Sequence, residues 1–224
     1  MSAGALELHE VWLALGPHQL LPPLSLRIAP GTIATVMGPS GCGKSSLLAY
    51  LCGVLEPGFR AGGGIVLDGR DIATTAPERR RLGLLLQDEK LFPHLSVGEN
   101  LAFALPARHR GRERRRLVEA ALGEAGLTGH GDRDSVTLSG GQRARVALMR
   151  TLLAEPLALL LDEPFAGLDQ PLKHQFRQVI FHKIRTLGLP ALLVTHNLDD
   201  ATAAAGPVVR WAEPPPAPLG EVES

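Results

Sequence analysis

The stretch that decides the fold of this 224-residue chain is Gly38-Pro39-Ser40-Gly41-Cys42-Gly43-Lys44-Ser45. It fits G-x-x-x-x-G-K-[ST], the pattern of a phosphate-binding loop. An apolar, strand-like run precedes it at 32–37 and a helix-like run follows at 46–55, which is the context that the pattern requires. Glycines allow backbone angles closed to other residues, so loop N–H groups can surround phosphate oxygens at a helix N-terminus. The sequence therefore predicts a nucleotide site that includes Ser46 at the helix start, rather than a glycine-rich turn without a ligand. Lys44 is expected to reach the outer phosphates, and the Ser45 hydroxyl to bind Mg²⁺.

Composition narrows the classes of partner. The formal net charge is +0, which does not favour a nucleic-acid partner. No apolar run approaches the ~18 residues of a membrane span. With Cys42 and Cys52 as the two cysteines, a disulfide framework is not expected. Cys42 is interpreted as a small filler of the loop, with a reactive thiol at the helix N-terminus as the alternative.

Apolar runs and turn residues give the order of the elements. A helix is expected at 172–187, stopped by Gly188 and Pro190, and helical structure dominates from 88 to about 150. The proline-rich tail at 213–224 is expected to be disordered. Strands are expected at 6–15, 24–28 after a Pro22-Pro23 turn, 32–37, 65–67, 82–86, 157–161 and 191–195. The pattern predicts an α/β core interrupted by a mostly helical insertion.

Two adjacent carboxylates, Asp162 and Glu163, follow the apolar run at 157–161. A carboxylate at the carboxyl end of a buried strand, near a phosphate loop, is well placed for Mg²⁺. Asp162 is expected to hold the metal, and Glu163 to orient or deprotonate the attacking water. The alternative, a solvated loop, is disfavoured because buried strands seldom end in two carboxylates without a cation.

A second glycine pair occurs in Leu138-Ser139-Gly140-Gly141-Gln142, ahead of a helix-like run. Ser139 is a plausible N-cap, and a glycine-rich helix start favours an anion. In isolation this segment could be a plain helix start. Behind a phosphate loop it is interpreted as a second nucleotide-binding element.

The order of these motifs resembles that of ABC ATPases over about residues 6–210. The resemblance rests on the phosphate loop, Gln87 after a strand, Leu138-Ser139-Gly140-Gly141-Gln142, Asp162-Glu163, Leu168-Asp169 and Thr195-His196. The segment Leu91-Phe92-Pro93-His94-Leu95-Ser96-Val97-Gly98-Glu99-Asn100 is similar to one in the ATPase subunits of bacterial iron, thiamine, polyamine and sulfate importers.

The resemblance implies an α/β P-loop NTPase fold. It has a RecA-like core with N-terminal antiparallel β strands at 1–87 and 151–212, and an inserted α-helical subdomain at 88–150. It also implies a head-to-tail homodimer in which ATP and Mg²⁺ lie between the phosphate loop of one chain and Ser139 to Gln142 of the other. Gln87 would sense Mg²⁺ and water, His196 would contact the γ-phosphate, and Asp169 would link the two sites. Catalysis would fall to Glu163, His196, Lys44 and Gln87.

For the biological role, the resemblance implies an importer ATPase. It would be peripheral on the cytoplasmic face of the inner membrane, with transmembrane permease subunits as partners and an extracytoplasmic substrate-binding protein as an indirect one. The helical insertion near Gln87 would receive the permease. Alternatives are an extrusion or mechanotransmission ATPase, a soluble non-transport ABC ATPase, and a small-molecule kinase, which has no use for the second glycine motif.

Two features depart from this pattern or lie outside it. The family usually has an aromatic ring for adenine about two dozen residues before the phosphate loop, where this chain has Leu15. Trp12 is interpreted as core or edge packing, and weaker base discrimination is expected. Arginine clusters at 79–81 and 108–116 are interpreted as a solvated surface, with anionic lipid or a partner contact as the alternative.

Overall fold

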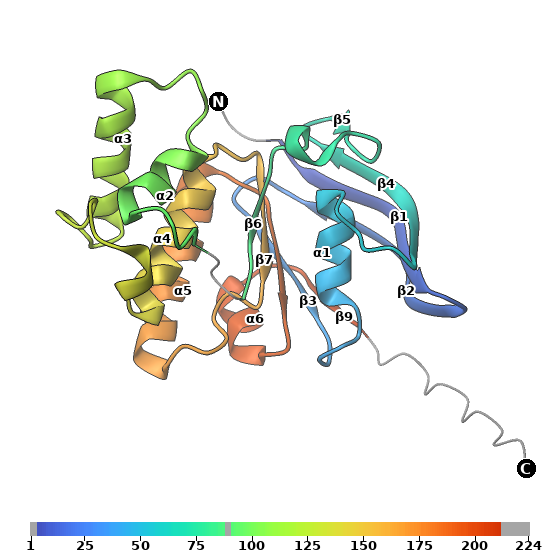
Figure 1. The fold of residues 1–224 in the computed structure, drawn as a ribbon. Helices are drawn as coiled ribbons and strands as arrows, with labels where there is room; N and C mark the ends of the chain where they lie inside the picture. The colour runs from blue at the N-terminus through green and yellow to red at the C-terminus, as the bar shows by residue number, and fades with distance from the viewer. Residues whose placement is uncertain (1–3, 88–90, 212–224) are drawn as a thin grey trace, which may run out of the picture.

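The computed structural model describes residues 4–87 and 91–211, so the tail predicted to be disordered at 213–224 lies outside the described residues. Two sheets lie next to each other, and helix α1 (Lys44–Cys52) packs between them (Figure 1). One continuous core joins the two sheets through the buried face of α1, where Leu47, Leu48 and Leu51 are inaccessible to solvent. The phosphate-loop helix is therefore held by packing on both sides.

The first sheet is antiparallel and N-terminal. Its strands are β1 (Leu6–Leu15), β2 (His18–Ile28), β4 (Phe59–Leu67) and β5 (Arg70–Asp71). They lie in the order β2-β1-β4-β5, so β2 is an edge strand. A short 3₁₀ helix, η1 (Pro77–Arg79), follows this sheet.

The second sheet is parallel, and its strands β7 and β8 are covered on both faces. The strands are β3 (Ile33–Met37), β6 (Leu82–Leu85), β7 (Ala158–Asp162), β8 (Ala191–Thr195) and β9 (Val208–Arg210), in the order β6-β7-β8-β3-β9. Alternate residues of β7 and β8 face α1 on one side and α5 (Gln170–Leu187) on the other. Every residue of β7 and β8 is buried, as continuous apolar runs require. Helix α6 (Leu198–Ala204) follows β8.

Residues 97–153 form a group of helices with a hydrophobic core of their own. The elements are α2 (Val97–Ala104), α3 (Gly111–Glu124), the 3₁₀ helix η2 (Ser135–Thr137) and α4 (Gly140–Leu153). Val97, Leu101, Leu122 and Val146 belong to this core. Helix α4 also contributes Ala144 and Leu148 to the core beneath the parallel sheet, so it connects the two packed regions (Figure 1).

Two predicted strand boundaries were wrong. The turn expected at Pro22-Pro23 is absent, because β2 runs through both prolines. Proline lacks an N–H donor but is tolerated on an edge strand, where one side of the backbone has no partner. The short strand expected at 65–67 begins instead at Phe59 and includes Gly62 to Gly64, because β1 supplies a full antiparallel partner for this segment.

The interpretation of 79–81 as a solvated surface was wrong for Arg80, which is buried. Its guanidinium donates hydrogen bonds to the carbonyls of Tyr50 and Leu51 in the last turn of α1, and to those of Ala73 and Thr75. Carbonyls at a helix C-terminus carry partial negative charge, which compensates the buried cation. Arg80 therefore anchors the far end of the helix whose N-terminus forms the candidate site.

Candidate functional site

The phosphate loop connects the end of β3 to the start of α1. Gly41 and Gly43 have φ angles of +80° and +101°, which side-chain-bearing residues rarely adopt. Helix α1 begins at Lys44, directly after this turn. The first backbone N–H groups of a helix lack carbonyl partners within it, so this end of α1 can receive an anion.

Lys44 is the cation of the site. Its side chain is 4% exposed, and Nζ donates hydrogen bonds to the carbonyls of Gly38 and Pro39, at 2.9 and 2.7 Å. These contacts hold the ammonium group against the loop. Phosphate oxygens brought into the loop would meet a charge that is already in position.

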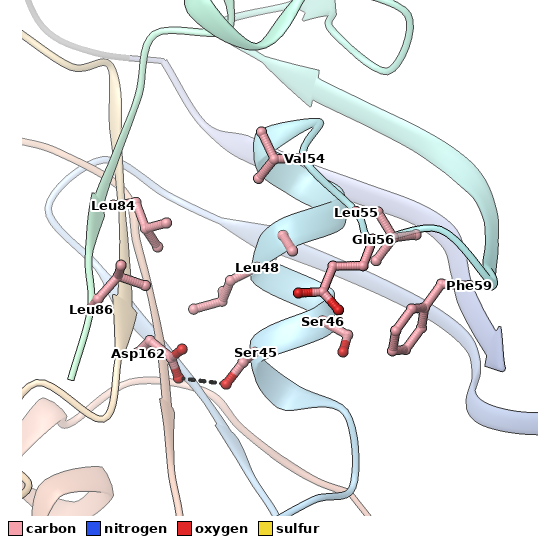
Figure 2. Close-up of a pocket in the computed structure, with 11 residues that line it drawn as sticks. Ser45, Ser46, Leu48, Val54, Leu55, Glu56, Phe59, Leu84, Leu86 and Asp162 are labelled. Carbon is pink, nitrogen blue, oxygen red and sulfur yellow. Dashed lines mark hydrogen bonds between the residues drawn. The ribbon is translucent and has the colours of Figure 1, made fainter. Parts of the chain in front are cut away.

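Asp162 and Ser45 come together from distant parts of the chain. The Ser45 hydroxyl donates a hydrogen bond of 3.0 Å to Oδ1 of Asp162 at the end of β7 (Figure 2). Burial raises the pKa of Asp162 above its ordinary value; the Ser45 hydrogen bond and Lys44 act in the opposite direction, and Glu163 adds to the rise. Because burial makes the charged form of this carboxylate costly in the free protein, a bound cation would stabilise that charged form.

These two groups satisfy the chemistry of a Mg²⁺ site. Mg²⁺ takes one or two protein oxygens and completes its shell with water and substrate phosphates. In the described part of the chain, no group of three or more His, Cys, Asp or Glu residues could hold a metal ion by itself. The Ser45–Asp162 pair beside the phosphate loop therefore offers two oxygens of the kind that Mg²⁺ takes together with phosphate.

Glu163 adopts an unusual backbone conformation, with φ = +43°. Its N–H donates to the carbonyl of Val194, which fixes the turn after β7 against the end of β8. One carboxylate oxygen lies 2.8 Å from Nδ1 of His196, and the other lies 3.8 Å from Nζ of Lys44. Because the carboxylate accepts, Nδ1 of His196 carries the proton in this contact. Strained backbone held by its surroundings is common at functional sites.

One polar cavity of about 430 Å³ collects most of these groups. Ala166 was not predicted from the sequence, because it follows the carboxylates on a loop whose path no sequence pattern defines. The predicted residues Cys42 and Asp162 are not among the lining residues. Cys42 packs in the core behind the loop, and Asp162 lines a second hollow next to this cavity. The lining residues are Ser40, Gly41, Gly43, Lys44, Ser45, Ser46, Gln87, Glu163, Ala166 and His196.

The adjoining hollow, of about 360 Å³, lies along α1 and is mostly apolar (Figure 2). It shares Ser45 and Ser46 with the polar cavity and extends to Leu84, Leu86 and Phe59. It contains neither Lys44 nor Glu163. The polar cavity is therefore the candidate for phosphate chemistry.

The second glycine motif forms the start of α4, as its N-cap residue predicted. The Ser139 hydroxyl accepts from the N–H of Gln142, and the Gln142 side chain accepts from the N–H of Ser139, a reciprocal capping box. Among the described residues that line the polar cavity, none comes from Ser139 to Gln142. Asp169, likewise outside the cavity, caps α5 by accepting from the N–H of Leu172.

Leu15, at the end of β1, is aliphatic at the position where the family usually has an aromatic ring. Leu15 is 43% exposed and pairs with Phe59 across the β1–β4 ladder. Trp12 is half-buried and lies over Gly62 of β4: a Cβ on that glycine would come within 2.6 Å of the indole nitrogen. Trp12 is thus packed against β4, in a sheet where β1 is an internal strand.

Comparison with known proteins agrees with these motifs. The family model for ABC transporters matches residues 21–166, more than half of the chain. The chain is 45% identical to the uncharacterized ABC transporter ATP-binding protein YnjD of Escherichia coli K12, over 91% of this chain and 94% of that protein. It is 37% and 38% identical to Fe(3+) ions import ATP-binding proteins of Rhizobium meliloti 1021 (FbpC 1) and Brucella abortus 2308 (FbpC).

These matches differ in how much of the relative they include. The chain spans 59% of the length of the two iron-import relatives and nearly all of the Escherichia coli one. No helix in the described ranges is both long and apolar enough to cross a bilayer. The chain belongs to the ABC transporter family and is similar over most of its length to that family's ATP-binding subunits.

Proposed function

We propose that this chain is the ATPase subunit of an ABC importer and powers uptake through separate membrane permease subunits. The observation that carries the proposal is the polar cavity, which joins the phosphate loop, Gln87, Glu163 and His196 from four separate segments. Relatives named for import support uptake over extrusion or a role without transport. The cargo would be selected by the permease and an external binding protein.

ATP and Mg²⁺ fit the residues that are present. Gly38 leaves no free space for a larger side chain, because a Cβ there would lie 2.9 Å from Sγ of Cys42. Gly43 is restricted instead by its backbone, whose φ of +101° strains any other residue. The loop amides and Lys44 would hold the phosphates, while the oxygens of Ser45 and Asp162 would hold Mg²⁺. The bound cation would offset negative charge on the phosphates.

Glu163 is the proposed general base. Its carboxylate lies in the polar cavity, and its contacts with His196 and Lys44 fix its orientation. From this position it would accept a proton from the attacking water. His196 would hold the carboxylate and contact the terminal phosphate, and Gln87, which also lines the cavity, would orient the water.

The site requires a second copy of the chain. Ser139, Gly140 and Gly141 form a capped, anion-favouring helix start, but they do not line the cavity of their own chain. Two chains in head-to-tail contact would bring this helix start onto the nucleotide held by the partner's phosphate loop. Asp169, at the start of α5, would lie near that contact and connect the two sites.

The helical region provides a place for the permease. We propose that 88–150 is an inserted α-helical subdomain and that 1–87 and 151–212 form the RecA-like core with its N-terminal antiparallel strands. The independent hydrophobic core of α2, α3 and α4 supports this division. The permease would dock near Gln87 and Phe92 to Val97, and the chain would then lie on the cytoplasmic face of the inner membrane.

The test is purification of the tagged chain from detergent-solubilised membranes of its source, followed by mass spectrometry and an ATPase assay. We expect a polytopic permease to co-purify and Mg²⁺-dependent release of phosphate from ATP. Recovery of soluble partners or nucleic acid alone, at moderate salt, would move the assignment to an ABC ATPase without a transport role.

A further inference from the structure

Trp211 lies directly beneath the phosphate loop, although it is the last residue after β9 that the structure describes. Its side chain is 6% exposed and belongs to the same core as Cys42 and Leu47. Strand β9 lies beside β3 (Figure 1), and β3 delivers the chain into the loop. Trp211, the next residue after β9, therefore comes next to Gly38.

Both ends of the loop rest on this residue. A Cβ on Gly38 would lie 3.0 Å from Cβ of Trp211, so the backbone there has no free space toward the tryptophan. At the other end, a Cβ on Gly43 would lie 3.7 Å from the indole ring and 3.5 Å from Leu20. The indole ring thus lies behind Gly43, whereas Gly38 meets the Cβ and the backbone carbonyl of the same residue.

Two hydrogen bonds fix the indole in this place. The backbone N–H of Trp211 donates to the carbonyl of Met37, at 2.6 Å. The indole N–H donates to the carbonyl of Leu20 in β2, at 2.7 Å. Leu20 belongs to the same hairpin as Leu15, so one side chain connects the phosphate loop to the strand pair where the base is expected.

We infer that Trp211 is a positioning residue that sets the phosphate loop for the triphosphate of ATP; this inference rests on the proposed function. Gly41 and Gly43 provide the loop's shape but not its rigidity, because glycine is the least restricted residue. The indole supplies that rigidity from behind. Because Nζ of Lys44 is bonded to the Gly38 carbonyl, a shift of Gly38 would also displace the ammonium group.

The first experiment reads the contact without disturbing it. The chain has two tryptophans, so Trp12→Phe leaves Trp211 as the single indole reporter. We expect its emission to change saturably with Mg-ATP, at the concentration that half-saturates hydrolysis. Trp211→Phe, which retains Trp12, should give no such change. Constant Trp211 emission at saturating Mg-ATP would overturn the inference.

The second experiment separates positioning from stability. Trp211→Leu removes the ring and the Leu20 hydrogen bond, whereas Trp211→Phe keeps an aromatic ring; Trp12→Leu is the matched control. We expect Trp211→Leu to raise KM for ATP about tenfold with kcat within about twofold, since misplaced binding groups weaken substrate binding. Trp211→Phe should raise KM less, and Trp12→Leu should not change it.

The outcomes distinguish the inference from the proposed function. A purely structural role would reduce the active fraction, so apparent kcat would fall at constant KM. An unchanged KM in both Trp211 variants would therefore refute positioning. If Trp211→Leu does not fold, Trp211→Phe and the emission experiment decide. A wild-type chain that neither binds nor hydrolyses ATP would refute the proposed function instead.

Discussion

The phosphate loop and the Ser139–Gly141 segment are both glycine-rich starts of helices, yet the fold treats them differently. The first lies between two sheets, with Lys44, Ser45, Asp162 and Glu163 assembled around it. The second starts α4 with a complete capping box, and Gly140 has open space beside it: a Cβ there would meet just the end of Arg143, at 3.9 Å. One helix start has charged and polar side chains from distant segments beside it, and the other has space beside Gly140.

This difference teaches that a helix N-terminus becomes a reaction site through what the tertiary structure places next to it. Both segments have the backbone properties that favour an anion. The proposed metal ligands and the proposed base lie next to the first segment. The second would contribute to catalysis when a partner chain brings a nucleotide to it. Substitutions in the two segments should therefore have different effects on ATP binding, dimerisation and hydrolysis.

The largest expected effect is at the assembled site. Glu163→Gln should reduce ATP hydrolysis about a thousandfold, because the amide cannot accept the proton from water. ATP binding should persist, and the variant should form a stable ATP-bound dimer in size-exclusion chromatography. Steady-state phosphate release measures the loss.

The matched control is Glu155→Gln, which removes the same charge from another residue with positive φ, outside the cavity. Hydrolysis should continue near the wild-type rate in this control. Normal turnover by Glu163→Gln would show that Glu163 is not the general base, so the two helix starts would no longer differ in this respect.

A smaller loss is expected at the exposed helix start. Gly140→Asp should reduce hydrolysis at least about a hundredfold, because a carboxylate would repel the γ-phosphate bound by the partner. The open space beside Gly140 should let the variant fold and still bind ATP as a single chain. ATP affinity and ATP-dependent dimerisation are measured in parallel.

Gly123→Asp is the control, since Gly123 is an exposed helical glycine with a similarly open neighbourhood. It should dimerise and hydrolyse ATP normally. If Gly140→Asp did so as well, the second helix start would have no role in the nucleotide site.

A gain of moderate size is expected at the base end. Leu15→Tyr should tighten ATP binding about fivefold, because an aromatic ring at this exposed position can stack on adenine. Leu187→Tyr, at a similarly exposed leucine at the end of α5, should leave affinity unchanged. Equal affinities for ATP in wild type and Leu15→Tyr would show that missing stacking at residue 15 does not weaken binding.

The smallest effect concerns stability. Burial raises the pKa of Asp162, so the fold favours its protonated form, and unfolding free energy falls as pH rises through that raised pKa. Asp162→Asn removes this penalty and should raise the melting temperature of the nucleotide-free protein by about 2–4 °C at pH 7. The gain should disappear at acidic pH, below the range in which a free aspartate titrates.

The same substitution should weaken Mg²⁺-dependent ATP binding, so stability and function would move in opposite directions. Asp132→Asn, at an exposed carboxylate, should change neither property. A lower melting temperature for Asp162→Asn at pH 7 would contradict the cost assigned to burying this carboxylate.

Local sequence signals predicted much of this molecule. The continuous apolar runs at β7 and β8 indicated buried parallel strands, and the helix ending before Gly188 agrees with a glycine in the left-handed conformation. Ser139 capped its helix as expected. The errors at β2 and β4 arose because prolines and glycines were read as breaks, whereas a neighbouring strand can hold them in an extended conformation.

Three features could be predicted from the sequence alone: the phosphate loop, the position of two carboxylates after a buried strand, and the family. Each depends on residues that are adjacent in the chain. Tertiary structure alone decided that Arg80 is buried, that Ser45 meets Asp162, and that Trp211 supports Gly38. These contacts join residues that are far apart in sequence, and their energies depend on burial and distance, which a linear pattern does not contain.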